Sequence, residues 1–170
     1  MIIDNMFHIF IDMKKIFYSL AIIALLVSCN LEDVPDASFA VTMTGDGIAG
    51  TTTFTAATAV GKVGDSIEII AGDTDGAIFR VAVPFNGQTG TYNAVVVATT
   101  ASEAEIQYTP EPSDILKFSV ADSGTLNITK IDDEGTENLI DGNFNVKTVN
   151  LSGDTIRMQG DFVSIPIILE

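Results

Sequence analysis

The sequence predicts an all-β fold, a single antiparallel domain built as a β-sandwich or a barrel-like structure. From residue 38 onward, apolar and polar residues alternate with a period of two, which is typical of strands with one buried and one exposed face. Turn sequences rich in glycine and aspartate recur roughly every 10–14 residues, the spacing of antiparallel hairpins. No segment after residue 30 has the apolar periodicity of a long helix. These observations together favour one β domain over residues 38–170.

Strands are expected wherever the alternation is regular. In each of these segments the apolar side chains should share one face, and Phe118, Phe144 and Phe162 are predicted to lie in the core. At the C-terminal end the apolar positions change phase after Phe162, so a bulge is expected at Gly160. Pro166 predicts an edge strand or a strand end. The alternating segments are 39–43, 67–69, 79–83, 116–120, 126–128, 144–146 and 156–158.

Turns are expected between these segments. The longest connection marked by prolines is 109–114 (TPEPSD). The remaining turn sequences combine glycine, which tolerates positive φ, with aspartate, asparagine or serine, whose side chains bond nearby backbone groups. They lie at 45–47, 64–65, 72–76, 86–87, 122–124, 133–135 and 152–154.

The N-terminal region has the features of a lipoprotein signal peptide. Lys14 and Lys15 precede an apolar core of 12 residues at 16–27, and Ser28 then places a small residue before Cys29. We expect cleavage between Ser28 and Cys29 and lipid attachment to the thiol of Cys29. A transmembrane helix is the alternative, but it needs roughly 20 apolar residues.

This interpretation divides the chain into four parts. Residues 1–12 carry two aspartates and no lysine or arginine, the wrong charge for the start of a signal peptide, so translation is expected to begin at Met13. Residues 13–28 are then the signal peptide, 29–37 an acidic tether, and 38–170 the β domain. A lipid-anchored protein of this kind is expected at the outer membrane, facing the periplasm or the cell surface.

Composition restricts the partners of the mature chain. It carries six Lys and Arg against 21 Asp and Glu, a net charge of −15. Nucleic acid is excluded as a partner, because its binding depends on basic residues against phosphate. Cationic partners, including Ca²⁺, would be attracted, although solubility alone also explains an acidic surface.

Few catalytic chemistries are compatible with the sequence. Cys29 is the only cysteine and His8, before the signal peptide, the only histidine, which excludes Ser-His-Asp and Cys-His catalysis and argues against zinc. The sequence contains no glycine-rich phosphate loop, so no cofactor is predicted. Glu103 and Glu105 share a strand face and form the one carboxylate pair suited to glycoside hydrolysis, with Tyr92 and Tyr108 available for stacking. A polar, solvent-facing strand is the alternative, and we predict that the protein is not an enzyme.

Two acidic turns are candidates for Ca²⁺ binding. Residues 73–76 (Asp-Thr-Asp-Gly) match the start of a Ca²⁺ loop, but position 12 of such a loop would be Pro84 instead of glutamate. Residues 132–135 (Asp-Asp-Glu-Gly) are similar in kind. Acidic hairpin turns explain both segments better than calcium loops do, so no metal site is predicted.

The second half of the chain resembles a family of small Bacteroidota lipoproteins of unknown function. The resemblance rests on four motifs within residues 90–167: 90–92 (GTY), 124–130 (GTLNITK), 141–146 (DGNFNV) and 160–162 (GDF). It implies an envelope lipoprotein whose motif glycines form turns and bulges and whose phenylalanines fill the core. It implies no active site. Glu32 and Asp33, close behind Cys29, resemble the acidic signal that directs some of these lipoproteins to the cell surface.

The sequence therefore predicts a lipid-anchored, non-catalytic binding or assembly module of the cell envelope, with an unknown protein or glycan as partner. Two alternatives remain. A small lipoprotein enzyme inhibitor would show one long, rigid, protruding loop. An accessory glycan-binding protein would show a row of exposed aromatic side chains.

Overall fold

The computed structural model describes residues 36–169, except 47, 49, 86, 112, 133–137 and the side chain of Ile115. Its contacts divide the chain into two units, Met1–Val34 and Pro35–Glu170. The expectations for Ser28, Cys29, the tether up to residue 35 and the turn at 133–135 lie outside the described residues.

The described residues form strands almost throughout, and no α-helix occurs among them, so the all-β prediction is confirmed. A short 3₁₀ turn, η1 (Ile115–Lys117), precedes the first of three long C-terminal strands. The strands are β1 (Ser38–Gly45), β2 (Thr51–Thr55), β3 (Thr58–Val63), β4 (Ile67–Gly72), β5 (Ile78–Val83), β6 (Gly90–Ala94), β7 (Glu103–Thr109), β8 (Ser119–Asp132), β9 (Leu139–Asn150) and β10 (Thr155–Leu169).

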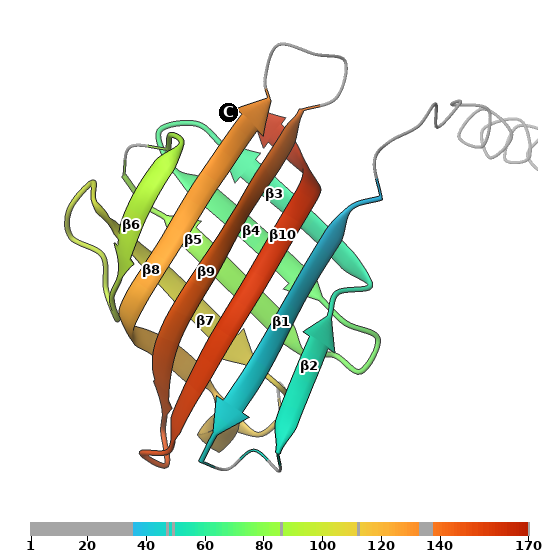
Figure 1. Ribbon diagram of the computed structural model, residues 1–170, viewed down its shortest axis with the longest axis vertical. Coiled ribbons are helices and arrows are strands. Elements are labelled where there is room, and N and C mark those ends of the chain that lie inside the picture. The colour runs from blue at the N-terminus through green and yellow to red at the C-terminus, as the bar shows by residue number, and fades with distance from the viewer. Residues whose placement is uncertain are drawn as a thin grey trace, which may run out of the picture. The chain divides into compact units, whose positions relative to one another are not determined.

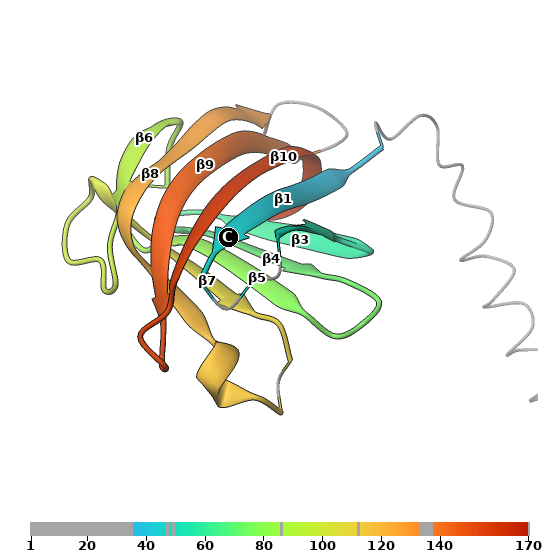
Figure 2. The same ribbon diagram turned by 60° about the horizontal axis from the view of Figure 1, so that its bottom comes forward.

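Within the described part of the chain, hydrogen bonds join all ten strands into one sheet that curls back on itself (Figures 1 and 2). The pairing runs β3-β4-β5-β7-β8-β9-β10 and returns to β3, while β1 and β2 extend from the free part of the β10 edge. β6 lies between β7 and β8 at one end. Most pairs are antiparallel as predicted, but β10–β3 and β6–β7 are parallel, so the sheet is mixed.

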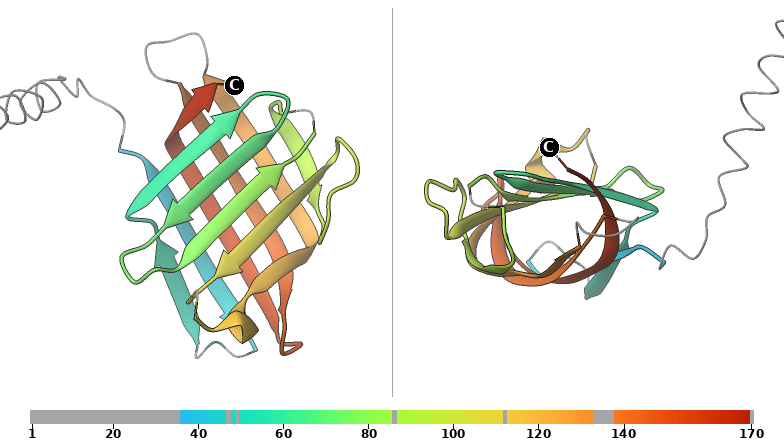
Figure 3. Two further views of the ribbon diagram at one scale, coloured as in Figure 1. Left: turned by 180° about the vertical axis from the view of Figure 1, so that it is seen from behind. Right: turned by 90° about the horizontal axis from the view of Figure 1, so that it is seen from above.

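The ring is flattened into two layers (Figure 3). β3, β4, β5 and β7 form one layer, and β8, β9, β10 and β1 cross it on the other side. Because side chains alternate along each strand, every second one points into the space between the layers. Aromatic rings fill much of this core, with centroids of neighbouring rings 4.6–6.4 Å apart: Phe39, Phe54, Phe79, Tyr108, Phe144 and Phe162.

A bulge in β10 produces the change of phase that the sequence shows. Phe162 pairs with Gly142 and Ile165 with Ile140, so Val163 and Ser164 face the single residue Asp141. Ser164 has a φ of 55°, and its N–H donates to Asp141 Oδ1 at 2.5 Å. The bulge was predicted at Gly160, but it lies at Val163 and Ser164, three and four residues further along the chain.

Pro166 was wrongly predicted to mark an edge strand or a strand end. β10 pairs with β9 along one side and with β1 and then β3 along the other. The β1 pairing ends at Val163 and the β3 pairing begins at Ile167. Pro166 lies in this gap, where its missing N–H removes no bond from the second side.

Two of the three phenylalanines predicted to lie in the core are there. Phe144 and Phe162 are 1% and 0% exposed, whereas Phe118 is only half-buried. β8 begins one residue later, and Ser119 and Ala121 face inward, so the predicted phase of 116–120 is wrong. The 3₁₀ turn interrupts the alternation, which is why Leu116 is exposed.

Candidate functional site

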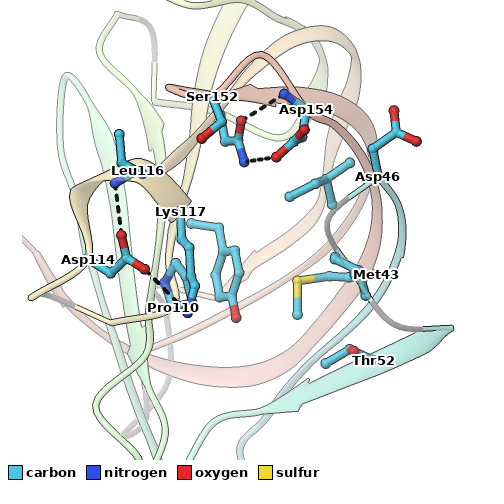
Figure 4. Close-up of a pocket in the computed structure, with 13 residues that line it drawn as sticks. Met43, Asp46, Thr52, Pro110, Asp114, Leu116, Lys117, Ser152 and Asp154 are labelled. Atoms are coloured by element: carbon cyan, nitrogen blue, oxygen red, sulfur yellow. Dashed lines mark hydrogen bonds and ion pairs between the residues drawn. The ribbon is translucent and has the colours of Figure 1, made fainter.

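A cavity of about 500 Å³ opens at one end of the ring. This mouth is formed by the end of β1, the β1–β2 connection, the segment from β7 to η1, and the β9–β10 turn, which lie together at the bottom of Figure 1. Figure 4 shows Met43 and Thr52 across the opening from Asp114 and Lys117. Segments far apart in the sequence therefore surround one space.

The inner wall of the cavity is apolar and continuous with the core. Met43, near the end of β1, pairs with Met158 of β10, and Ile156 lies diagonally across from Met43 near the start of β10; both Met43 and Ile156 are buried. Tyr108 lies beside them and stacks on Phe79, with ring centroids 4.6 Å apart. The aromatic core thus holds Tyr108 in place and fixes this wall.

The β9–β10 turn forms a rigid part of the rim. The Asp154 N–H donates to Asn150 Oδ1 at 2.8 Å, and Asn150 Nδ2 donates to Asp154 Oδ2 at 3.0 Å (Figure 4). Gly153, at a φ of 86°, allows the chain to reverse between them. The reciprocal bonds fix the Asp154 carboxylate at the edge of the cavity.

Asp114 orders the opposite rim. Its Oδ1 accepts the Leu116 N–H at 3.2 Å, and its Oδ2 forms an ion pair with Lys117 Nζ at 3.4 Å. Asp46 lies at the end of β1, where its N–H bonds the Thr155 carbonyl at 2.9 Å. Within the described residues no hydrogen bond or ion pair engages the Asp46 carboxylate. The cavity thus has three carboxylates and one ammonium group around it.

Burial raises the pKa of Tyr108 above its ordinary value, and the negative charge of Asp73 raises it further. The phenol is therefore neutral and able to donate or accept a hydrogen bond at physiological pH. Together, the cavity offers an apolar wall, one phenol and a rim dominated by hydrogen-bond acceptors. This set of groups is suited to reversible binding.

Glu103 and Glu105 share the outer face of β7 as predicted, but they bind backbone and not a common cleft. The Glu103 carboxylate accepts the N–H groups of Thr99 and Thr100 at 2.7 and 3.0 Å. These bonds, the one from Thr99 first, lower the pKa of Glu103. Glu103 therefore closes the β6–β7 connection, residues 95–102.

Glu105 fixes the same connection from its other side. Its Oε1 accepts the Ala98 N–H at 3.0 Å, and its Oε2 accepts a bond from the Arg80 guanidinium at 3.3 Å. Arg80 is also paired with Glu68 at 2.7 Å. Partial burial by itself lowers the pKa of Arg80. The hydrogen bonds and negative charges of Glu68 and Glu105 outweigh this effect, so the pKa is raised above its ordinary value. The connection is thus held by charged groups of three adjacent strands.

Two apolar side chains in the first half of the 95–102 connection project into solvent. Val96 and Val97 are 54% and 66% exposed. The connection stands out from the side of the ring near β6 (Figure 3). The connection is therefore fixed by hydrogen bonds to Glu103 and Glu105 while it exposes two apolar side chains.

The acidic turn at 73–76 uses its first carboxylate internally. Asp73 Oδ1 accepts the N–H groups of Asp75 and Ala77 at 2.9 and 2.8 Å, while Gly76 adopts a φ of 91°. This is an aspartate-stabilised turn, in which the side chain bonds backbone two residues on. Among the residues that the structure describes, no group of three or more His, Cys, Asp and Glu side chains is arranged to hold a metal ion.

The two tyrosines considered for stacking do not form a surface platform. Tyr92 is 4% exposed, and its hydroxyl donates to the Gln88 carbonyl at 2.6 Å. Tyr108 is half-buried against Phe79. The most exposed aromatic side chain in the described part is Phe85, which follows Pro84 after β5. Phe85 does not line the cavity.

Sequence reasoning did not find the cavity. It identified 109–114 and 152–154 as turns, but no pattern in the sequence brings them beside Met43 and Asp46. No protein-family model, curated protein or solved structure matches this chain. In the described part of the chain, no helix has the length and apolar character needed to cross a membrane.

Proposed function

We propose that this protein is a lipid-anchored, non-catalytic binding module of the cell envelope, and that the cavity at the mouth of the ring is its binding site. The observation that carries the proposal is the cavity itself. Its volume of about 500 Å³ lies within the usual range for small-molecule sites, and its composition of an apolar wall with a few polar groups is typical of them.

The walls of the site are pre-organised. Stacking on Phe79 holds Tyr108, and reciprocal hydrogen bonds hold Asn150 and Asp154. A site whose groups are already fixed loses little conformational entropy on binding. This favours recognition of a specific ligand over incidental surface contact.

Attachment through Cys29 is compatible with an accessible mouth. The tether would enter the domain at Ser38, whereas the cavity lies at the other end of β1, near Gly45. Seven residue steps along an extended strand span roughly 23 Å. A lipid on Cys29 and a ligand in the mouth would therefore not compete for the same end of β1. An outer-membrane location, facing the periplasm or the cell surface, follows from the same proposal.

The anchor is tested by Cys29→Ser in cells. The parent should carry the mass of the attached acyl chains and partition with membranes, and the variant should lose both properties. Membrane partitioning that is unchanged in the variant, together with an unmodified parent mass, would overturn the proposed anchor.

The site is tested by titrating the purified full-length chain with a fragment set of cationic, anionic and neutral compounds. Thr52→Trp should block binding, because Thr52 lines the cavity. Thr53→Trp is the matched control, since Thr53 is also exposed but is not part of the lining. Equal binding by the two variants, or no fragment bound by the parent, would contradict the proposed site.

The 95–102 connection, which is held by hydrogen bonds to Glu103 and Glu105, supports a second candidate function, that of a small enzyme inhibitor. A fixed loop that exposes Val96 and Val97 could occupy the apolar subsite of an enzyme. The test measures inhibition of a panel of secreted proteases and glycan hydrolases. Val97→Asp should abolish any inhibition, while Val163→Asp, at an exposed valine of β10, should preserve it. A parent chain that inhibits no member of the panel would count against this candidate.

A further inference from the structure

The charges around the mouth define the ligand class. Asp46, Asp114 and Asp154 contribute three carboxylates, and Lys117 contributes one ammonium group. Lys117 is already paired with Asp114 at 3.4 Å. Two carboxylates, those of Asp46 and Asp154, therefore remain without a basic partner among the described residues.

An anionic ligand is disfavoured at this site. A carboxylate or phosphate group would lie beside three negative side chains, and the whole mature chain carries a net charge of −15. A concave site in which one sign of charge predominates concentrates counter-ions of the other sign. Fatty acids and nucleotides are therefore poor candidates for this cavity.

A bare metal ion is also disfavoured, for a geometric reason. The carboxylates at the mouth come from different segments and do not form a metal-binding group within the described part of the chain. An organic cation needs no convergent set of ligands, because its own N–H groups can donate hydrogen bonds to separate carboxylates. It also carries an apolar body that can cover Met43, Ile156 and Tyr108.

We infer that the cavity binds a small amphipathic cation, an amine or guanidinium group on a short aromatic or aliphatic body. The inference rests on the proposed function of the cavity as a binding site. The cationic group would lie at the rim near Asp46 and Asp154, and the apolar body would lie against Met43 and Ile156. The volume of about 500 Å³ accommodates a body of this size.

The test uses three probes with one phenyl ring and chains of similar length: phenethylamine, 2-phenylethanol and 3-phenylpropionate. Isothermal titration of the full-length chain should show phenethylamine binding about fivefold or more tightly than the alcohol, and the carboxylate binding most weakly. Higher salt should weaken the binding of the amine and leave that of the alcohol unchanged.

Substitutions locate the effect. Asp154→Asn and Asp46→Asn should each lower the affinity for phenethylamine several-fold and leave that for 2-phenylethanol unchanged. Asp161→Asn removes the same charge at an exposed position of β10 outside the lining, and should change neither affinity. Urea denaturation of each variant checks that the fold is retained.

The outcomes separate the two claims. If the alcohol or the carboxylate binds as tightly as the amine, and Thr52→Trp blocks that binding, the cavity is a binding site and the inferred cation class is wrong. If the amine binds equally well to Asp154→Asn, Asp46→Asn and the parent, the inference is also overturned. Failure of every probe and fragment at the mouth would overturn the proposed function itself.

Discussion

The ring of Phe144 on β9 lies over the bare Cα of Gly160, its cross-strand partner on β10. Two residues along the same pair of strands, Phe162 of β10 lies over Gly142 of β9. Each strand contributes one glycine and one phenylalanine, so the two G-x-F motifs of the sequence pair with each other. The glycines make room for the rings, which explains both motifs as one packing arrangement in the core.

This relationship predicts that a single methyl group is harmful at either glycine. Gly160→Ala should lower the free energy of unfolding by about 1–3 kcal/mol, because the new Cβ would overlap the Phe144 ring. Gly142→Ala should cost as much or more, since its Cβ would also meet the backbone of Asn127. Urea denaturation measures both changes.

Gly72→Ala is the matched control for these variants. Gly72 is also a strand glycine, the last residue of β4, but the nearest atoms to its added Cβ are at ordinary van der Waals distance, 3.8 and 3.9 Å. Its free energy of unfolding should change by less than about 1 kcal/mol. Equal losses at Gly72 and Gly160 would mean that the phenylalanine rings do not set the requirement for glycine.

A second prediction separates the phenylalanines by burial. Phe144→Ala should cost roughly 3–5 kcal/mol of unfolding free energy, because the ring is 1% exposed and its removal leaves a cavity. Phe118→Ala should cost clearly less, since Phe118 is half-buried in the connection before β8. Thermal or urea unfolding measures both losses. Equal losses of unfolding free energy in the two variants would contradict the observed phase of β8.

Much of the fold could be predicted because strand alternation is a local property. The alternation at 39–43, 79–83 and 144–146 identified strands whose apolar side chains face the core. It failed at 116–120, where a 3₁₀ turn shifts the phase, and it misplaced the bulge of β10. Both errors arise from backbone geometry that depends on neighbouring segments, such as the bond between Asp141 and Ser164.

The candidate site could not be predicted, because long-range strand pairing creates it. The β1–β10 pairing brings Ile156 diagonally across from Met43, although over a hundred positions separate the two residues in the sequence. Likewise, the parallel pairing of β10 with β3 closes the ring, and no alternation pattern specifies a partner strand. Glu103 and Glu105 were correctly placed on one face, but their roles depend on backbone N–H groups that the sequence does not locate.

A third prediction concerns acid and the 95–102 connection. The pKa of Glu103 is lowered in the folded chain, so this carboxylate favours the folded loop above the unfolded pKa of 4.5. That contribution is lost as the pH falls through the lower folded value. The protection factors of the Thr99 and Thr100 amides, which compare the intrinsic exchange rate with the measured one, should therefore fall as the pH is lowered.

Glu103→Gln is the control for this titration. Glutamine keeps an acceptor oxygen but does not titrate, so the additional pH dependence at Thr99 and Thr100 should vanish. Exchange at Ala57, whose N–H donates to the backbone carbonyl of Gly72 at 2.8 Å, should follow the intrinsic trend in both proteins. An identical pH dependence in parent and variant would contradict the assigned role of Glu103.

The last prediction concerns the phenol at the inner wall of the cavity. Burial is the larger cause of the raised pKa of Tyr108 and the charge of Asp73 the smaller, so Asp73→Asn should lower the pKa while leaving it above the ordinary value of 10.0. Asparagine retains the oxygen that accepts the N–H groups of Asp75 and Ala77, so the turn should persist. Because the folded state holds this proton more tightly, stability should fall as the pH rises from the unfolded to the folded pKa. Ultraviolet titration of phenolate absorbance, with Tyr108→Phe identifying the transition, measures the shift. A pKa that is unchanged by Asp73→Asn would leave burial as the sole cause.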